Sequence, residues 1–352
     1  MLFTPLTLRG VTLRNRIMVS PMCQYSCEDG YATDWHLVHL GSRAVGGAGL
    51  VMVEATAVQA HGRISPHDMG IWKDDHVPAL ARIARFVEEQ GAVPGIQLAH
   101  AGRKASVAAP WRGGGALDET HGGWPVVGPS AVAYAEGSPV PRPLSPADVA
   151  EVAEDFVRAA GRAREAGFKV VELHFAHGYL VHEFLSPLSN QRSDSYGGSL
   201  ENRVRLAREI TRAVRARWPE GLPLLARIST SDWAPGGWDV EQSVELARVL
   251  KSEGVDLVDC SSGGNIHSAK VDAGPGYLVP DAQRIRREAG VPTATVGFIT
   301  SAQQAEQILR NGQADLVVLA RQFLRDPYWP LHAAAELRAE VAWPPQYLRA
   351  KT

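Results

Sequence analysis

Eight short apolar runs recur along the chain, and amphipathic segments separate them. Most of these runs lead directly into Gly, Ser, His or Arg. Short apolar runs of this kind predict buried parallel strands. The eight expected strands are residues 16–21, 50–54, 93–98, 170–174, 224–228, 257–261, 293–296 and 316–319.

The intervening segments carry helix signals. Residues 82–89 place Ile83, Phe86 and Val87 on one face. For residues 146–166, Ser145 is the expected N-cap, with Pro146 at the first helical position. We expect Ser199 to cap a helix that runs through Arg217. Thr300 with Gln303 resembles a capping box that opens a helix ending near Leu309.

Strand and helix alternating eight times predict an α/β protein, a single (β/α)₈ TIM barrel over residues 1–352. The alternative is an open, doubly wound sheet. That fold is disfavoured because no Gly-x-Gly-x-x-Gly follows an early strand. Gly113–Gly115 neither follows an expected strand nor opens an expected helix, so we expect a loop tip there.

Two segments fall outside the repeating pattern. Residues 99–145, after the third strand, are rich in Gly, Pro, Ala and Trp, and an excursion of that length is typically functional. Residues 343–352 form an apolar, aromatic and basic tail. Its prolines argue against helix, so we expect it to pack on its own barrel or to reach a neighbouring subunit.

Composition narrows the class of protein. The 352 residues are 45% hydrophobic and 21% charged, with a formal net charge of −2. These values are typical of a globular protein and give no sign of nucleic-acid or membrane binding. The N-terminus lacks the pattern of a secretory signal. Three cysteines are too few for a disulfide scaffold and suggest a reducing compartment, so we expect a cytoplasmic protein.

The strongest chemical signal is the stretch from Val170 to Tyr179. Its apolar part ends in His174, His177 and Tyr179, at the end of a strand where barrel enzymes keep their chemistry. Two imidazoles can donate hydrogen bonds to a substrate oxygen, and a phenol can deliver a proton. A lone histidine would more often be a satisfied interior residue. A zinc site is disfavoured because no third ligand has metalloenzyme spacing.

Other strand ends indicate a bound phosphate and a planar heterocycle. The loops after strands seven and eight form a frequent phosphate site in such barrels; Gly297 permits close backbone approach there, and Arg321 supplies a bidentate cation. Gln97 offers a donor and an acceptor to a ring edge. Arg227 would project into the mouth, although it could also be an ordinary ion-pair partner. Flavin mononucleotide (FMN) fits this set.

Several motifs resemble the old yellow enzyme family of flavin-dependent ene-reductases, in order and over essentially the whole chain. The cysteine after Pro21-Met22 and the Gln-Tyr end of the chain are similar to the thermophilic-like subgroup, which includes xenobiotic reductases. The matching motifs are residues 20–25 (SPMCQY), 97–104 (QLAHAGRK), 174–179 (HFAHGY) and 184–190 (FLSPLSN), followed by Arg192, Asp194 and residues 196–199 (YGGS).

The resemblance implies non-covalent FMN at the barrel mouth and NADPH as the reductant. Arg227 would lie near the pyrimidine end of the ring, where reduced flavin carries negative charge. Gly297, Ala320 and Arg321 would hold the phosphate. The residues expected to contact the ring are Ser20, Pro21, Met22, Cys23, Ala55, Gln97 and Arg227.

The resemblance also implies substrate roles. His174 and His177 would bind the carbonyl or nitro oxygen of an activated alkene, and Tyr179 would protonate its α carbon. Tyr25 would be a second phenol near that oxygen. Cys23 would tune the flavin and touch the substrate. The protein is expected to be a dimer or tetramer in which Arg349 reaches a neighbouring subunit's site.

Two positions depart from the family pattern. Ala320 replaces a usual glycine, which would be mildly strained if the position needed a positive φ. Phe175 replaces a smaller residue, and its alternation in the strand predicts packing against a helix. Cys27 and Cys260 are expected to be structural.

Three functions compete. The first is an FMN-dependent, NADPH-consuming ene-reductase. The second is a larger relative such as a 2,4-dienoyl-CoA reductase, disfavoured because this chain lacks the cysteine cluster and the extra length. The third is a flavin-binding protein without turnover, disfavoured because storage needs no proton donor.

Overall fold

The computed structural model describes residues 1–351 and contains eight parallel strands that close into a barrel. The last strand pairs with the first, Val317 with Ile17, which leaves no free edge. Every expected strand is present, so the (β/α)₈ prediction is confirmed. The strands are β3 (Ile17–Val19), β4 (Leu50–Ala57), β5 (Val93–Ala99), β8 (Val170–Phe175), β9 (Leu224–Ser229), β10 (Leu257–Ser261), β11 (Thr293–Thr295) and β12 (Leu316–Leu319).

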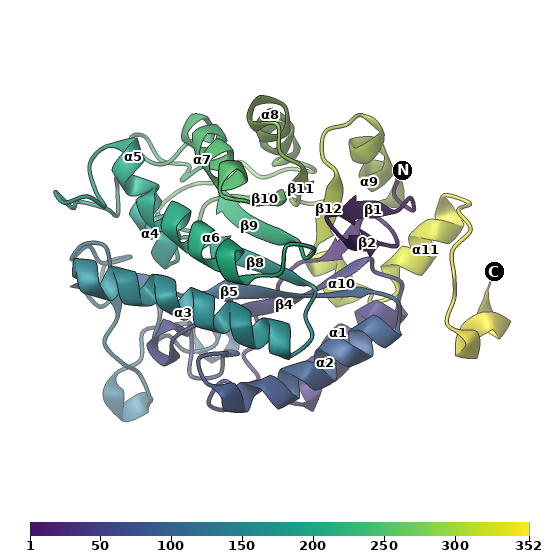
Figure 1. Cartoon of the computed structure of the whole chain (residues 1–352), viewed down its shortest axis with the longest axis horizontal. Coiled ribbons are helices and arrows are strands. Elements are labelled where there is room, and N and C mark those ends of the chain that lie inside the picture. The colour runs from purple at the N-terminus through teal and green to yellow at the C-terminus, as the bar shows by residue number, and fades with distance from the viewer. Residues whose placement is uncertain (352) are drawn as a thin grey trace.

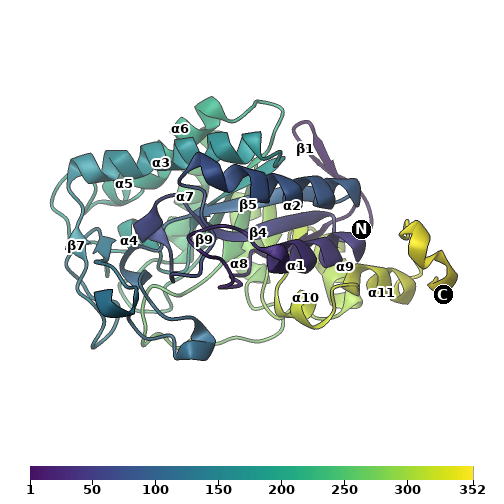
Figure 2. The ribbon, with the colours of Figure 1, turned by 90° about the horizontal axis from the view of Figure 1, so that it is seen from below.

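Helices follow the strands and cover the outside of the barrel (Figures 1 and 2). The long amphipathic ones bury one face against the strands. They are α1 (Asp34–Val45), α2 (Val77–Glu89), α3 (Pro146–Glu165), α6 (Arg205–Arg217), α7 (Val240–Ser252), α8 (Val279–Ala289) and α9 (Ala302–Arg310). Shorter ones are α4 (Leu180–Leu185), α5 (Leu200–Arg203), α10 (Arg321–Arg325) and α11 (Trp329–Glu336).

Side-chain alternation along the strands separates two apolar layers. Val51 and Val53 of β4 belong to the large core between strands and helices, whereas Leu50 and Met52 belong to a smaller cluster inside the barrel. Phe175 is fully buried in the outer layer, as predicted. The hairpin of β1 (Leu6–Leu8) and β2 (Val11–Leu13) adds Leu8 and Leu13 to the inner cluster. It therefore closes the end of the barrel where the strands begin, which we call the lower end; the opposite end, where the strands finish, is the mouth.

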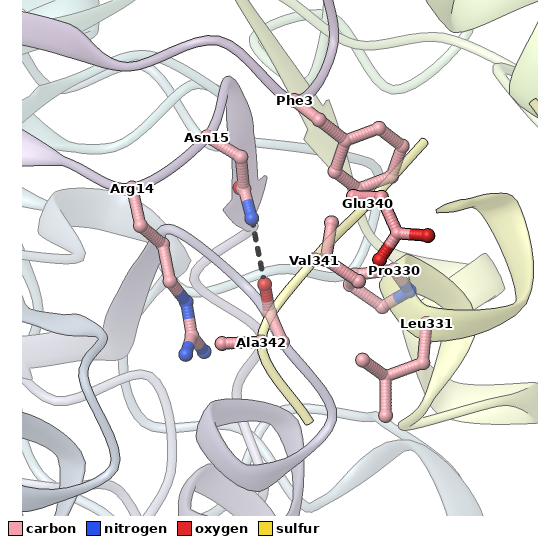
Figure 3. Close-up of a pocket in the computed structure, with 9 residues that line it drawn as sticks. Phe3, Arg14, Asn15, Pro330, Leu331, Glu340, Val341 and Ala342 are labelled. Atoms are coloured by element: carbon pink, nitrogen blue, oxygen red, sulfur yellow. Dashed lines mark hydrogen bonds between the residues drawn. The ribbon is translucent and has the colours of Figure 1, made fainter. Parts of the chain in front are cut away.

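A cavity of about 190 Å³ lies at this lower end, where the N-terminal segment meets the chain after α11 (Figure 3). The Asn15 side chain crosses one side of it and donates to the Gly47 carbonyl at 2.8 Å. None of the residues expected at the active site lines it. The lining residues are Phe3, Arg14, Asn15, Gly47, Pro330, Leu331, Glu340, Val341 and Ala342.

The excursion after β5 contains short elements of its own. Gly113 and Gly114 both have positive φ and are exposed, which confirms the expected loop tip. The elements are the 3₁₀ turns η3 (Gly102–Lys104), η4 (Pro110–Arg112) and η5 (Glu119–His121), and the strand pair β6 (Val127–Gly128) and β7 (Arg142–Pro143). Two further turns, η1 (Ala60–Gly62) and η2 (Asp74–His76), follow β4.

Helix starts agree with the sequence at one site and differ at two. Ser145 caps α3 and forms a capping box with Asp148, as expected. Ser199 caps only the short α5, because the helix is interrupted at Val204 and α6 begins at Arg205. The capping prediction at Thr300 was wrong by one residue: Ser301 accepts from the Gln304 amide and begins α9.

The C-terminal tail was expected to contain no helix, and this was wrong. Residues Pro345–Ala350 form the 3₁₀ helix η6, which Pro345 can open because the first amide of a helix needs no partner. The tail continues outward from α11, away from the barrel (Figures 1 and 2). Across residues 1–351, no helix has the length and hydrophobicity to span a bilayer.

Candidate active site

The structure brings His174, His177 and Tyr179 together at the carboxyl end of β8. Ring centroids are 5.0 Å apart for the two histidines and 5.1 Å apart for His174 and Tyr179, with nearly perpendicular planes. His174 Nε2 lies 3.3 Å from His177 Nδ1. Among residues 1–351, the Tyr179 hydroxyl has no hydrogen-bond partner. The two ring nitrogens and the phenol therefore converge on one region.

The turn after β8 is backbone-strained, and the strain serves this convergence. His177 has φ +63° and is followed by Gly178 with φ +71°. A Cβ on Gly178 would lie 2.2 Å from the Gly264 carbonyl oxygen, so only glycine fits. A left-handed histidine is uncommon and is retained where the surrounding structure holds it. The turn folds the His177 ring back toward His174.

A buried histidine–aspartate pair supports this turn. His182 Nδ1 accepts from the Gly178 amide at 2.9 Å, and its Nε2 lies 3.1 Å from Asp232 Oδ1. Both side chains are fully buried. The amide can only donate, so His182 presents its other nitrogen to the carboxylate. The sequence analysis missed both residues. The available signal was a histidine within the apolar run that follows Tyr179.

Lys104 is the last residue of the family motif 97–104, but the sequence did not reveal its position in the site. Its Nζ donates to the carbonyl oxygens of His177 and Gly264, at 2.8 Å each. The ammonium also lies 5.1 Å from the Tyr179 ring centroid and 4.6 Å from that of Tyr134. Burial lowers the pKa of Lys104 to about 8. The excursion thus contributes a cation that clamps the strained turn beside the phenol.

His174, His177 and Tyr179 are all in protonation states that can donate a hydrogen bond. Burial, and then the charge of Arg227, hold the pKa of His174 and of His177 well below the usual value, so both rings are neutral near pH 7. Burial, reinforced by Cys23 and Tyr25, raises the pKa of Tyr179 well above its usual value. Its phenol therefore keeps its proton until a stronger base draws it off.

The segment after β3 places Cys23 and Tyr25 beside Tyr179. All three pack against the apolar patch of Ile64, Ala101, Ala105 and Val126. Tyr25 has φ +49°, and its ring meets Trp111 of the excursion edge-on at 5.6 Å. Burial raises the pKa of the Cys23 thiol, so it is present as a thiol. Cys27 and Cys260 are buried, and all three cysteines are free.

A β-bulge at Glu54 organises this wall. The pairing of β4 with β5 shifts between Val53 and Ala55, which places Ala55 opposite Gln97. The extra residue, Glu54, accepts from the Gln24 amide and lies 3.2 Å from His36 Nε2. It therefore fixes the segment that carries Cys23 and Tyr25.

Cys27, His36 and Glu54 also bring one potential metal ligand each within 4.8 Å of one another. However, the Thr33 amide donates to His36 Nδ1 at 3.0 Å. The proton of a neutral His36 then sits on Nε2, where a metal would have to bind. This hydrogen-bond pattern favours a structural role for the cluster.

Inside the barrel, the residues expected under the flavin ring form a polar layer. Gln97 Nε2 donates to Glu172 Oε1 at 2.7 Å, and Arg227 donates to Ser20 Oγ at 3.2 Å. Arg227 Nε also lies 3.1 Å from Asp259 Oδ2, so this arginine is an ion-pair partner, and its expected contact with the flavin ring stays a prediction. Burial, and then the nearby Asp259, raises the pKa of Glu172 to about 8.

The expected phosphate end is a cavity of about 230 Å³. Gly297 has φ +113°, and a Cβ there would lie 2.8 Å from the Tyr277 ring, so a side chain at this position would clash with Tyr277. The Arg321 guanidinium stacks over Phe298 at 4.5 Å. Ala320 has φ −109°, so its replacement of glycine causes no left-handed strain. Arg325, Tyr277 and Phe298 also line the cavity and were missed.

These features fit FMN. Two arginines and a glycine cradle suit a phosphate, and Arg227 with Ser261 connects that cavity to the polar layer inside the barrel. The side chains of Gln97 and Arg227 carry hydrogen-bond donors, which suit the acceptors at the edge of a flavin ring.

Arg349 does not join the site of its own chain. It is exposed on η6, in the tail that points away from the barrel (Figure 1).

A parallel barrel with a phosphate cradle, a polar ring-binding layer and a His–His–Tyr cluster at one mouth defines a flavin-dependent oxidoreductase. The model of the NADH:flavin oxidoreductase / NADH oxidase family matches residues 1–340, and the chain belongs to this family. The resemblance to old yellow enzymes is thereby confirmed, and FMN is the cofactor.

Individual relatives agree with this assignment. An NADPH dehydrogenase of Geobacillus sp. (strain WCH70) is 52% identical over 351 residues, covering 99% of this chain and 98% of that protein. The old yellow enzyme homologue from Zymomonas mobilis superimposes with a TM-score of 0.80 at 26% identity, covering 100% of this chain and 99% of the other. A 2-naphthoyl-CoA reductase gives a TM-score of 0.88 at 25% identity, covering 95% of this chain but 52% of that longer one.

Proposed function

We propose that the protein is an ene-reductase that uses NADPH to reduce C=C bonds conjugated to a carbonyl or nitro group. The observation that carries this proposal is the convergence of His174, His177 and Tyr179 beside the expected ring site. NADPH as reductant is supported by the 52% identity to an NADPH dehydrogenase. When bound, FMN supplies the chemistry of accepting a hydride and passing it to the β carbon of the alkene.

The chain's own residues bind the substrate and handle its proton. The imidazoles of His174 and His177 hold the carbonyl or nitro oxygen and stabilise the negative charge that develops there. Being neutral, they bind this oxygen without giving up a proton. Tyr179 then protonates the α carbon, and its raised pKa keeps that proton in place beforehand.

The excursion limits access to this chemistry. Trp111 packs against Tyr25, and Lys104 anchors the excursion to the turn that carries His177. By covering one side of the His–His–Tyr cluster, the excursion would reduce the water around the reacting oxygen and so strengthen the hydrogen bonds to it. We further propose that Cys23 and Tyr25 contact the substrate. Arg349 would act in the site of a second copy of the chain, because it lies outside its own.

The test is a two-step anaerobic titration of the purified, FMN-loaded protein. NADPH should bleach the flavin absorbance, and adding 2-cyclohexenone should restore it in proportion to the enone added. Bleaching without recovery would reject enones as the substrate class, and no bleaching would reject turnover with NADPH altogether. Gel filtration with and without residues 343–352 tests whether the tail supports an oligomer.

A further inference from the structure

Ser261, at the carboxyl end of β10, lines the phosphate cavity and also contacts His177 of the active-site histidine pair, a contact that the function proposed above does not use. Its Oγ lies 2.6 Å from His177 Nε2. On the neighbouring strand, Ser229 is its register partner, and Ser229 Oγ accepts from the His177 backbone amide at 2.9 Å. One serine therefore holds the backbone of His177 and the other holds its ring.

The proton on His174 is fixed by a neighbouring amide. The Ala176 amide points at His174 Nδ1 at 3.3 Å, and an amide can only donate. Nδ1 is therefore an acceptor, and a neutral His174 carries its proton on Nε2. That N–H points at His177 Nδ1, 3.3 Å away. With no substrate between the rings, His177 Nδ1 accepts this hydrogen bond and Nε2–H donates to Ser261.

A substrate oxygen changes the requirement on His177. If both rings donate to that oxygen, His174 uses Nε2–H without any change, whereas His177 must carry its proton on Nδ1. His177 Nε2 then becomes an acceptor and needs a donor. Among residues 1–351, the hydroxyl of Ser261 is the group within hydrogen-bond distance of that atom. A hydroxyl can donate as well as accept, so it satisfies both tautomers.

We propose that Ser261 is a positioning residue that sets the tautomer of His177: by rotating its hydroxyl from acceptor to donor, it stabilises the Nδ1–H form that binds the substrate oxygen. The ring stays neutral throughout, and one proton changes place between its two nitrogens by exchange with water. A carbonyl or carboxylate at this position could only accept and would hold His177 in the form that cannot donate. The inference rests on the proposed role of the histidine pair.

The direct test is ¹⁵N NMR of the FMN-loaded wild-type protein with labelled histidines, because the two ring nitrogens shift in opposite directions when the proton moves. Without ligand we expect His177 to be protonated at Nε2. Saturation with 4-hydroxybenzaldehyde, whose phenolic oxygen mimics the substrate oxygen, should move the proton to Nδ1. A ligand-bound His177 that remains protonated at Nε2 would overturn the proposal.

Variants supply the second test. Ser261→Ala should weaken 4-hydroxybenzaldehyde binding about tenfold, the value of one hydrogen bond, and abolish the tautomer change. Ser261→Thr keeps the hydroxyl and should restore both. Ser262→Ala removes a hydroxyl one residue further on and is the matched control, with unchanged affinity expected. Because Ser261 also lines the phosphate cavity, affinities are compared at equal flavin content.

The outcomes separate the two proposals. If wild-type protein binds the phenol with the expected tautomer change but does not reduce 2-cyclohexenone, the proposed reaction fails and the role of Ser261 stands. If the enone is reduced but Ser261→Ala binds the phenol as tightly as wild type, the role of Ser261 fails alone.

Discussion

The two ends of this barrel are built from opposite kinds of side chain. At the lower end the strands bury an apolar cluster inside the barrel, and Leu8 and Leu13 of the hairpin add to it. At the mouth, buried ionisable groups such as Glu172, Arg227 and Asp259 take their place. Glu172 Oε2 is buried without a hydrogen-bond partner among residues 1–351. Burying such groups costs free energy, so the apolar end must offset what the mouth requires.

Backbone strain occurs at both ends, since Arg9 in the turn between β1 and β2 at the lower end has φ +49°. At the mouth, Tyr25, His177 and Phe298 all have positive φ, and each belongs to a wall of the proposed site. The barrel strands themselves contain no such residue in the part of the chain that the structure describes. Strained conformations persist only where surrounding contacts hold them. The contacts of Lys104, His182 and Ser229 with the turn after β8 provide that support.

The sharpest test of this division is Tyr179→Phe at the mouth. Removing a general acid should slow enone reduction by about 10²–10⁴-fold while NADPH still bleaches the flavin. The free energy of unfolding should change little, because the hydroxyl has no protein partner to lose. Stopped-flow measurement of the two half-reactions distinguishes these effects. Equal rates of enone reduction in both proteins would remove Tyr179 from its proposed role.

Leu225→Ala at the lower end is the reciprocal control. Leu225 is fully buried in the inner cluster, so the substitution should lower the free energy of unfolding by about 2–5 kcal/mol. The folded, flavin-loaded fraction should turn over at the wild-type rate. Guanidinium titration and flavin-normalised kinetics measure the two quantities. A similar loss of activity in both variants would show that the two ends are not independent.

A smaller effect concerns the pH dependence of stability. Burial raises the pKa of Glu172 to about 8, against about 4.5 in the unfolded chain. The folded state therefore holds a proton that the unfolded state has released, and stability contributed by this proton falls as pH rises from about 4.5 toward 8. Glu172→Gln keeps an acceptor for Gln97 and should reduce this fall by at least about 1.4 kcal/mol, the equivalent of one pKa unit.

Guanidinium unfolding midpoints at pH 5 and pH 8 give the measurement, and Glu154→Gln on the exposed face of α3 is the matched control. An unchanged pH dependence in Glu172→Gln would mean that the buried carboxyl is ionised at both pH values. In that case, burying this carboxyl at the mouth costs less free energy than the comparison of the two ends implies.

Much of this organisation could be predicted from the chain alone, because it depends on local patterns. Apolar runs of four to six residues marked all eight strands, and strand ends are where a parallel barrel must place its mouth. His174, His177 and Tyr179 were found this way because they lie at the end of one strand and in the turn directly after it. Their convergence depends on one short turn rather than on distant contacts.

The parts that could not be predicted depend on segments far apart in sequence. Lys104 meets His177 across 73 residues, and Ser261 meets it across 84. The sequence around Lys104 or Ser261 contains no local pattern that predicts the contact. The ion pair of Arg227 with Asp259 joins neighbouring strands at one register position, which no spacing within a single strand reveals. Sequence periodicity predicts elements, whereas these contacts arise only when the barrel closes.

The smallest expected effect tests a polar group at the mouth that has a structural role only. The side chain of Ser301 accepts from the Gln304 amide and caps α9, so Ser301→Ala should lower the free energy of unfolding by about 1 kcal/mol. The Thr300 side chain makes no such bond among residues 1–351, and Thr300→Ala should cost much less. Thermal unfolding of the two variants measures the difference. Enone reduction should be unchanged in both when compared at equal flavin content, because Ser301 and Thr300 lie outside the His–His–Tyr cluster. Flavin content is matched because Thr300 lines the phosphate cavity. If Thr300→Ala lowered the free energy of unfolding more than Ser301→Ala, Thr300 would be the cap, as the sequence predicted.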